Sequence, residues 1–310
     1  MKPDYEGIWT NNEDPYPLKP YGKLIINAAL TGMVPRKKDT PHVPVTVDEI
    51  IDDAIACVAA GASILHLHAR DEDEAPTYRA DVYARIIEGI RRQCPDVIIC
   101  VSTSGRNFPD FERRAEVLDL DGFVKPDMAS LTLGSLNFPS QASINEPQVI
   151  MKLAGKMLEK GIMPELEIFD SGMVNTAKYL IRKSLIRPPF YFNIILGSIY
   201  SCQARISDLS YITSLLPRHS LWSGGGIGIF QLPVNSAAII MGGHIRIGIE
   251  DQIWYDYSKT ELTTNVKSII RAKRIATEIG REIATPAEVR MMLNPSINRR
   301  VRVRRVEHVS

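Results

Sequence analysis

Cysteine is scarce in this chain of 310 residues, and its few thiols lie far apart. The four cysteines are Cys57, Cys94, Cys100 and Cys202, and none of them belongs to a CxxC pair. This spacing argues against a disulfide framework and against a zinc site built from thiolates. We therefore expect reduced thiols in a cytoplasmic enzyme.

An excess of charge of one sign is also lacking. Lys and Arg number 37 and Asp and Glu 36, which gives a formal net charge of +1. This balance provides no electrostatic basis for binding nucleic acid or an acidic membrane surface. No apolar run reaches membrane-spanning length, and the first residues lack the apolar core of a signal peptide. We expect small-molecule partners, with no nucleic acid and no membrane.

The chain does have the composition of an ordinary globular protein, with 45% hydrophobic and 24% charged residues. No low-complexity linker divides it, so we expect one catalytic domain over residues 23–295. Residues 1–22, which contain prolines and mixed charges, are expected to form an extended arm ahead of the first strand. Residues 296–310 are expected to form a basic tail that is solvated or binds another subunit.

Short β-like runs alternate with helical patterns about eight times, which is typical of a parallel α/β fold. In the first helical pattern, Thr46 and Glu49 make a capping box and Gly61 stands at the expected end. No GxGxxG follows the first strand, which disfavours a dinucleotide-binding fold. We predict a single (β/α)₈ TIM barrel, with an open doubly wound sheet as the alternative. The expected strands are 23–29, 63–68, 97–103, 128–133, 163–169, 190–196, 220–225 and 244–249, and the clearest helices are 46–61, 81–92, 147–160, 259–279 and one from 285.

The second strand carries two histidines, His66 and His68, at alternate positions. Side chains at alternate positions of a strand share one side, so both imidazoles face the barrel interior while Leu65 and Leu67 face the helices. The pair lies near the C-terminal end of the strand, where barrel active sites are found. Two neutral imidazoles in this arrangement are a natural start for a zinc site. The alternative is a pair of hydrogen-bonded core histidines.

The last strand predicts the rest of this site. Isoleucines alternate along residues 244–249, so Arg246 and Glu250 share the inner side with the histidines. A buried Arg and Glu are costly unless they are paired or bound to something. The simple interpretation is a mutual ion pair. The functional one makes Glu250 the third metal ligand and places Asp251, just past the strand, as a general base at the barrel mouth.

Weaker polar clusters stand at other strand ends. They are residues 102–105, which read Ser-Thr-Ser-Gly, Ser130 on the fourth strand, and Glu165 and Glu167 on one face of the fifth. Such clusters are usually turns or salt bridges when taken singly, but together they add donors and acceptors to one rim. The run Ser223-Gly224-Gly225-Gly226 after the seventh strand is either a phosphate cradle or a tight turn.

Six motifs together resemble the beta-keto acid cleavage enzymes. They are residues 29–32 (Ala-Leu-Thr-Gly), 66–70 (His-Leu-His-Ala-Arg), 102–105, 164–167 (Pro-Glu-Leu-Glu), 171–173 (Ser-Gly-Met) and 242–251 (Gly-Gly-His-Ile-Arg-Ile-Gly-Ile-Glu-Asp). The last motif is highly specific. The resemblance covers nearly the whole chain, from about Leu24 to the helix after Thr285.

This resemblance implies a zinc-dependent TIM barrel, usually a homotetramer, that condenses a β-keto acid with acetyl-CoA and yields acetoacetate and a new CoA thioester. One Zn²⁺ per chain is expected. The site residues carried over by position have three roles. His66, His68 and Glu250 would be the zinc ligands, Asp251 the base with Arg246 as its catalytic partner, and Ser102, Gly105, Ser130 and Glu167 the substrate contacts.

Two positions depart from the family pattern. The member that cleaves an amino-substituted keto acid has a glutamate where this chain has Val34, and Ile229-Phe230-Gln231 stands where a polar or basic residue is common. We therefore expect a preference for keto acids with an uncharged, apolar side chain over amino-substituted ones. Two alternatives remain open: a metal-dependent barrel aldolase or hydrolase that works without CoA, and a catalytically silent barrel that serves as a binding or scaffold subunit.

Overall fold

Eight parallel strands close into a barrel in the computed structural model, which describes residues 21–293. The barrel order is β1-β10-β9-β8-β7-β4-β3-β2, with β1 pairing to both β10 and β2. The predicted TIM barrel is thus confirmed, and the open sheet is wrong. The strands are β1 (Ile26–Ala29), β2 (Ile64–Leu67), β3 (Ile98–Val101), β4 (Met128–Thr132), β7 (Met163–Ile168), β8 (Phe190–Leu196), β9 (Ser220–Gly226) and β10 (His244–Ile247).

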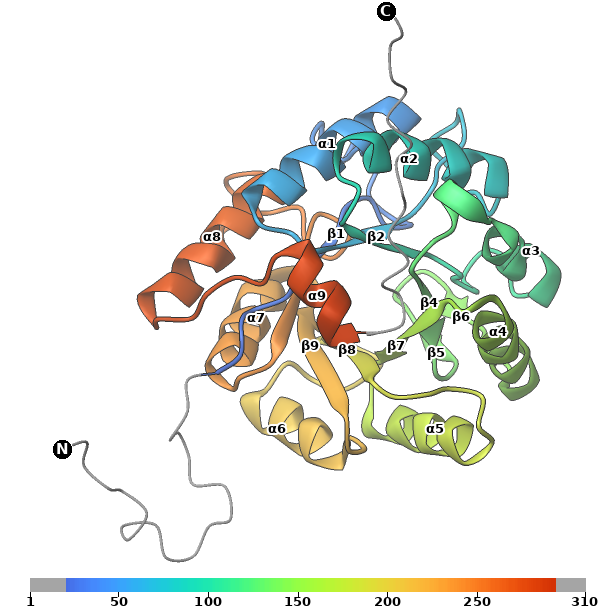
Figure 1. The fold of residues 1–310 in the computed structure, drawn as a ribbon. Helices are drawn as coiled ribbons and strands as arrows, with labels where there is room; N and C mark the ends of the chain where they lie inside the picture. Colours follow the sequence, from blue (N-terminus) through green and yellow to red (C-terminus); the bar gives the residue numbers. More distant parts are fainter. Residues whose placement is uncertain (1–20, 294–310) are drawn as a thin grey trace, which may run out of the picture.

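Helices surround these strands in a ring (Figure 1). The first begins after Thr46, whose hydroxyl and the Glu49 carboxylate form the predicted capping box, and it ends before Gly61. Short 3-10 turns lie at Glu116–Asp119, Gly122–Val124 and Gly228–Phe230. The α-helices are α1 (Val47–Ala60), α2 (Ala80–Gln93), α3 (Phe111–Ala115), α4 (Pro147–Lys160), α5 (Ser171–Arg182), α6 (Ile206–Leu215), α7 (Gln231–Ile240), α8 (Asn265–Glu278) and α9 (Pro286–Leu293). No described helix is both long and apolar enough to cross a membrane.

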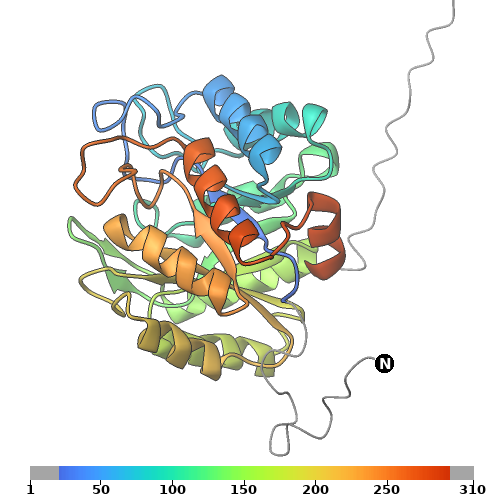
Figure 2. The same ribbon diagram turned by 90° about the vertical axis from the view of Figure 1, so that its left-hand side faces the viewer.

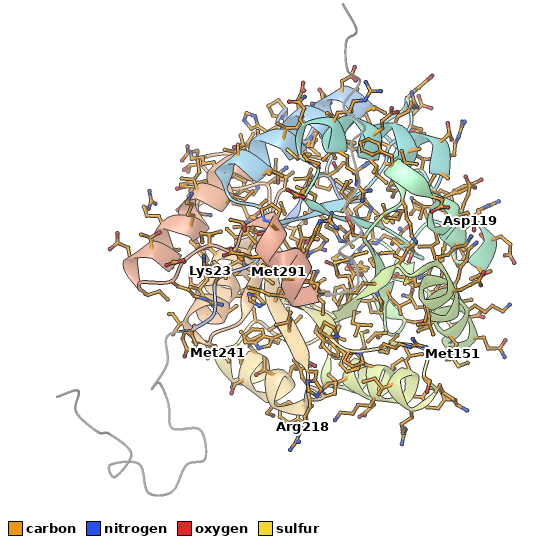
Figure 3. The ribbon with its side chains drawn as sticks, in the orientation of Figure 1. Lys23, Asp119, Met151, Arg218, Met241 and Met291 are labelled. Carbon is orange, nitrogen blue, oxygen red and sulfur yellow. The ribbon has the colours of Figure 1, made fainter. Side chains whose placement is uncertain are left out.

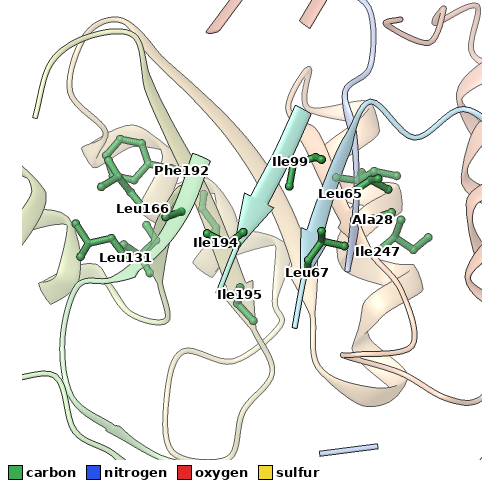
Figure 4. Close-up of a cluster of buried hydrophobic side chains, with 14 of the residues drawn as sticks. Ala28, Leu65, Leu67, Ile99, Leu131, Leu166, Phe192, Ile194, Ile195 and Ile247 are labelled. Carbon is green, nitrogen blue, oxygen red and sulfur yellow. The ribbon is translucent and has the colours of Figure 1, made fainter. Parts of the chain in front are cut away.

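The inner and outer sides of each strand have different partners. Leu65 and Leu67 belong to the large buried cluster between strands and helices, as the alternation predicts. Ala28 pairs in register with both Leu65 and Ile247, so these three strands present one continuous apolar surface to the helices (Figure 4). Of the residues labelled in Figure 3, Asp119, Met151 and Arg218 lie at the outer rim of the ring.

The two ends of the barrel differ: one is covered by a helix and the other is open. Helix α9 lies across the N-terminal end, where Val289 and Leu293 join Ile25, Ile64 and Tyr191 in a separate buried cluster. Figure 2 shows α9 at one end of the molecule and long loops at the other. Because α9 covers the first end, the predicted site residues stand at the end that is open in the part of the chain from residue 21 to residue 293.

Three local expectations differ from the structure. Strand β10 ends at Ile247 rather than at residue 249, because Ile249 N donates to the Asn265 side chain instead of to the backbone of a neighbouring strand. Helix α8 begins at Asn265 rather than near Lys259, because Thr264 caps it and Lys259 has a φ of 57°. The short hairpin of β5 (Leu136–Asn137) and β6 (Ala142–Ser143) was not predicted.

The glycine run after Ser223 belongs to strand β9 rather than to a turn. A Cβ on Gly224 would meet Ala238, and one on Gly226 would meet the backbone of Phe230, so these glycines allow α7 to approach the strand. Helix packing thus explains two of the three glycines without a phosphate. The predicted tail over residues 296–310, and residues 1–20 of the predicted arm, lie outside the described residues.

Candidate active site

A cavity of about 1040 Å³ opens at the C-terminal mouth of the barrel. Most residues that the sequence points to lie on its wall, although they come from five different strands. The members of the predicted site that line it are His66, His68, Ser102, Ser130, Glu167, Arg246, Glu250 and Asp251. Gly105 is the one predicted contact that does not line it. A Cβ there would lie 2.6 Å from the Ile144 carbonyl, so this glycine lets the loop after β3 pack against the β5–β6 hairpin.

The two histidines converge on one point at the end of β2. The Nε2 atoms of His66 and His68 lie 3.3 Å apart, and both rings are buried. Glu250, in the turn after β10, brings Oε1 to 3.3 Å from His68 Nε2 and Oε2 to 3.9 Å from His66 Nε2. Three donor atoms of the kinds that zinc prefers therefore face one another.

The two separations of 3.3 Å fit a metal ion, and the third, 3.9 Å, is slightly longer than the ideal spacing. Zinc–ligand bonds of about 2.0–2.2 Å in a tetrahedron put neighbouring ligand atoms roughly 3.3–3.6 Å apart. Glu250 Oε2 is buried and has no hydrogen-bond partner among the described residues. A buried carboxylate oxygen without a partner is costly, so a cation bound there removes a penalty that the protein alone leaves. The donor set and this oxygen both fit the ion that the resemblance implies.

Glu165 contacts the ring nitrogen of His66 that does not face His68. Its Oε2 lies 2.7 Å from His66 Nδ1, and its Oε1 accepts a hydrogen bond from Asn27 at 2.5 Å. Although burial opposes a charge on the ring, the Glu165 carboxylate raises the pKa of His66 to about 9. Cys100 is also close enough to complete a second possible ligand group with His66 and Glu165. Burial raises the pKa of that thiol, and Glu165 already occupies Nδ1, so this second group is a poor metal site.

Arg246 stands at the centre of three carboxylates. It donates from Nη2 to Glu250 Oε1 at 2.6 Å and from Nε to Asp251 Oδ2 at 2.8 Å, and its Nη1 lies 3.6 Å from Glu167 Oε1. The ion pair of the simple interpretation is thus present, but it engages one oxygen of Glu250 and leaves the other free. Burial raises the pKa of Asp251, although Arg246 opposes the shift.

Polar groups on β3, β4 and β7 complete the wall. Ser130 Oγ accepts a hydrogen bond from the backbone of Thr103, and Glu167 Oε2 accepts one from Thr132. Ser102 Oγ accepts from the backbone of Ser104. Glu167 is thus oriented by the neighbouring strand β4, Ser130 by the loop after β3, and Ser102 by its own loop.

Two arginines that follow β3, one in the loop and one in α3, were not singled out from the sequence. Arg106 lines the cavity and stacks on Phe138. Arg114 is buried and donates to Thr103 O and Asn145 Oδ1, both at 2.8 Å. Neither a loop nor a helix of only five residues has a periodicity that marks one arginine, so sequence patterns carry no signal for either residue.

The two positions that depart from the family pattern also lie at this mouth. Val34 lines the cavity and is 60% exposed. Ile229 and Phe230 line it as well, whereas Gln231 is buried and donates to the Gly248 carbonyl at 2.9 Å. Val34, Ile229 and Phe230 thus stand on the cavity wall, whereas Gln231 does not.

The sequence profile of the beta-keto acid cleavage enzyme family matches residues 23–294. The chain belongs to this family. Its members include the 3-keto-5-aminohexanoate cleavage enzyme of Fusobacterium nucleatum, which is 39% identical and covers 88% of this chain and 98% of the relative. The 3-oxoadipate:acetyl-CoA acetyltransferase of Cupriavidus necator is 36% identical over 87% of this chain and 94% of the relative.

A structural likeness supports the fold. The solved ternary complex of ObcA with a C4-CoA adduct and oxalate superposes with a TM-score of 0.75 at 21% identity, covering 82% of this chain and 67% of that one. Membership of the beta-keto acid cleavage family makes the chain an enzyme of the transferase type, and the scaffold alternative is therefore wrong.

Proposed function

We propose that this enzyme cleaves a β-keto acid with acetyl-CoA in a zinc-dependent reaction that yields acetoacetate and a new CoA thioester. The proposal rests on one observation: a possible metal-ligand set and a buried arginine–aspartate pair line the same cavity. His66, His68 and the free oxygen of Glu250 form a ligand set, and the Arg246–Asp251 pair stands directly beside it. The names of the relatives, which include acetyl-CoA transferases, support the co-substrate.

In this proposal the three ligands hold one Zn²⁺ per chain. When bound, the ion supplies Lewis acidity to the keto and carboxylate oxygens of the substrate. The Glu165 carboxylate orients His66 through Nδ1, which leaves Nε2 as its ligating atom. Arg246 fixes Glu250 through Oε1, so that Oε2 is the atom left for the ion.

Asp251 takes the proton from C2 of the keto acid. A carboxylate with a raised pKa is a stronger base than an ordinary one, and Arg246 holds its Oδ2 so that the other oxygen can face the substrate. The buried Arg246 guanidinium then stabilises negative charge that develops on oxygen, together with the Ser102 and Ser130 hydroxyls. Glu167, Ser102 and Ser130 hold the substrate from β3, β4 and β7, while Gly105 shapes the loop beside it.

The bonds of the proposed reaction balance. The C2–C3 bond of the keto acid breaks, and C2 forms a bond to the acetyl carbon, which gives acetoacetate. The thioester bond of acetyl-CoA breaks, and its sulfur bonds to C3, which gives the new acyl-CoA. The proton that Asp251 removes from C2 returns to the same carbon of the product, so no external acid, base or oxidant is consumed.

The test combines metal analysis with turnover. We expect about one zinc per chain, acetyl-CoA consumption that depends on a β-keto acid, and formation of acetoacetate. The double variant His66→Ala, His68→Ala should lose both metal and turnover, while His42→Ala, a matched change outside the ligand set, should lose neither. Metal binding without CoA turnover favours the aldolase or hydrolase alternative, and full metal content in the double variant contradicts the assignment.

The number of subunits is a separate part of the proposal. The resemblance implies a homotetramer, and sedimentation equilibrium on the whole chain would measure it. A monomer at all concentrations would contradict the tetramer without affecting the metal site.

A further inference from the structure

Arg106 lines the active-site cavity and forms no ion pair with any carboxylate among residues 21–293. Its guanidinium lies 3.6 Å from the centre of the Phe138 ring, which covers one face. Its Nε is buried, and neither this atom nor the terminal nitrogens donate a hydrogen bond to any residue from 21 to 293. A guanidinium has five N–H donors, so most of its hydrogen-bonding capacity is free to meet a ligand in the cavity.

The carboxylates of the cavity do not satisfy Arg106. Glu250 and Asp251 are paired with Arg246, and Glu167 lies next to the same arginine. They attract Arg106 from a distance and partly offset the cost of its burial, but none of them lies within ion-pair distance of it. Arg246 thus pairs with the acidic groups at the reacting centre, and the Arg106 guanidinium is available to bind an anionic ligand.

The position of Arg106 is fixed by the fold rather than by a flexible stem. Arg114 joins the loop after β3 to the hairpin by donating to Thr103 O and to Asn145 Oδ1. Gly105 lets the same loop pack against the Ile144 carbonyl. Phe138, under the guanidinium, is supported edge-on by Phe169, with ring centres 5.8 Å apart. A preorganised guanidinium loses little entropy when it binds an anion.

An apolar part of the wall borders Arg106. Leu136, Phe138 and Phe169 line the cavity on the hairpin side, away from the ligand set at the ends of β2 and β10. An aliphatic chain that leaves the reacting centre along this wall would bring its far end to the guanidinium. A planar guanidinium binds a carboxylate through two parallel hydrogen bonds, which makes a carboxylate the best match for that far end.

We propose that Arg106 binds a second carboxylate, at the far end of the acyl chain, so that the enzyme selects dicarboxylic β-keto acids. This inference rests on the proposed function, since it names the substrate class for that reaction. The charge of Arg106 ranks substrates by the charge of their side chain: anionic first, neutral next and cationic last.

The test compares two keto acids of six carbons, 3-oxoadipate and 3-oxohexanoate, which differ in a terminal carboxylate against a methyl group. The wild type should favour 3-oxoadipate by about 100-fold in kcat/KM, the scale of a buried charged hydrogen-bond pair. Arg106→Gln should lose most of that preference because kcat/KM falls for 3-oxoadipate, while kcat/KM for 3-oxohexanoate should change by less than about 3-fold. Arg106→Lys should recover part of it, because the charge remains but the planar fork does not.

Arg92→Gln, an exposed arginine paired with Glu88 on α2, serves as the matched control and should keep the wild-type preference. An equal fall for both keto acids would place Arg106 on the carboxylate they share, and a raised KM for acetyl-CoA alone would place it on the co-substrate. Either result, or an unchanged preference, overturns the proposal.

Binding of the two keto acids without acetyl-CoA, measured by calorimetry, separates the two proposals. Absence of turnover with every keto acid would defeat the proposed reaction. A selective loss of 3-oxoadipate affinity in Arg106→Gln would still establish the second carboxylate site, and equal affinities for the two acids in the wild type would exclude it.

Discussion

His66 lies between Glu165 and the proposed metal site, with Glu165 Oε2 2.7 Å from Nδ1 and His68 Nε2 3.3 Å from Nε2. One ring thus connects a fully buried carboxylate inside the barrel with the ligands at its mouth. A carboxylate behind a ligating imidazole fixes its tautomer and increases its basicity. The buried Glu165 carboxylate inside the barrel therefore orients a ligand of the proposed metal site at its mouth.

Glu165→Gln tests this relationship. The amide keeps the size of the side chain but removes the charge behind His66, so we expect metal affinity to fall by about 10- to 100-fold while the fold is kept. Competition with a chelator at known free zinc would measure the change. Glu159→Gln, the same change at an exposed position of α4, is the control. Unchanged affinity would show that Glu165 has a purely structural role.

Asp251→Asn tests the base. The amide oxygen can still accept the hydrogen bond from Arg246 Nε, so the site should stay assembled and retain its metal. Without a group that takes the C2 proton, turnover should fall by roughly two to four orders of magnitude. Asp39→Asn, an exposed residue at the same cavity, should stay near the wild-type rate. If Asp251→Asn retained most of the wild-type turnover, Asp251 would have no part in proton transfer.

The sequence predicts the barrel and most of its site because both depend on local patterns. Alternation along β2 puts Leu65 and Leu67 against the helices and His66 and His68 inside, and the structure confirms that arrangement. Barrel closure was a weaker inference, since it depends on β1 pairing with β10 from opposite ends of the chain, and no local period encodes that contact.

What the sequence could not give depends on contacts between loops. Arg106 is held against Phe138, which lies in the turn of the hairpin that β5 and β6 form. Glu165 and Glu167 are two residues apart on one face, yet one is bonded to His66 and the other to Thr132. Sequence alternation predicts the shared face and cannot tell these two roles apart.

Gly248→Ala tests the close approach of the turn after β10 to Ala29 on β1. A Cβ at this position would collide with the Ala29 carbonyl and lie 2.9 Å from Asn265 Oδ1. The backbone must move away, so we expect a loss of about 2–4 kcal/mol in unfolding free energy and a displaced Glu250 with weaker metal binding. Gly155→Ala, inside α4 with only Leu185 nearby at 3.8 Å, should be neutral or stabilising. Urea unfolding would measure both variants, and equal stability would contradict the steric argument.

Asp53 makes stability depend on pH. Burial raises its pKa to about 6, although hydrogen bonds from Asn265 and Cys57 oppose the shift. The folded protein therefore keeps a proton that the unfolded chain releases near pH 4, so this contribution to stability falls as pH rises from about 4 to 6, by up to about 3 kcal/mol.

Asp53→Asn removes that titration. Between about pH 4 and pH 6, urea unfolding should show the wild type losing stability relative to this variant. The neighbouring Asp52→Asn, at an exposed position, should follow the wild type. Parallel pH profiles for the wild type and Asp53→Asn would contradict the buried, protonated carboxyl group.

Val34→Glu tests how the cavity discriminates against cationic substrates. Val34 lines the cavity at the position where the amine-cleaving relative has a glutamate, so no carboxylate from this loop position meets a substrate ammonium group. Glu165 cannot replace it, because it is fully buried and bonded to His66 and Asn27, and Glu167 accepts from Thr132. Arg106 adds repulsion. We expect the wild type to prefer an aliphatic keto acid over its amino-substituted counterpart by at least about 10-fold in kcat/KM, since an unpaired ammonium in the cavity is costly.

Val34→Glu should narrow or reverse that ratio by raising kcat/KM for the amino-substituted acid, whereas Val34→Gln, which has the size without the charge, should leave it near the wild-type value. The ratio between the two substrates is the useful measurement, because a general loss of activity in either variant cancels from it. If the wild type favoured the cationic keto acid, another carboxylate at the cavity mouth would have to bind the amine in place of residue 34. The exposed Asp39 side chain, which also lines the cavity, would be the first candidate.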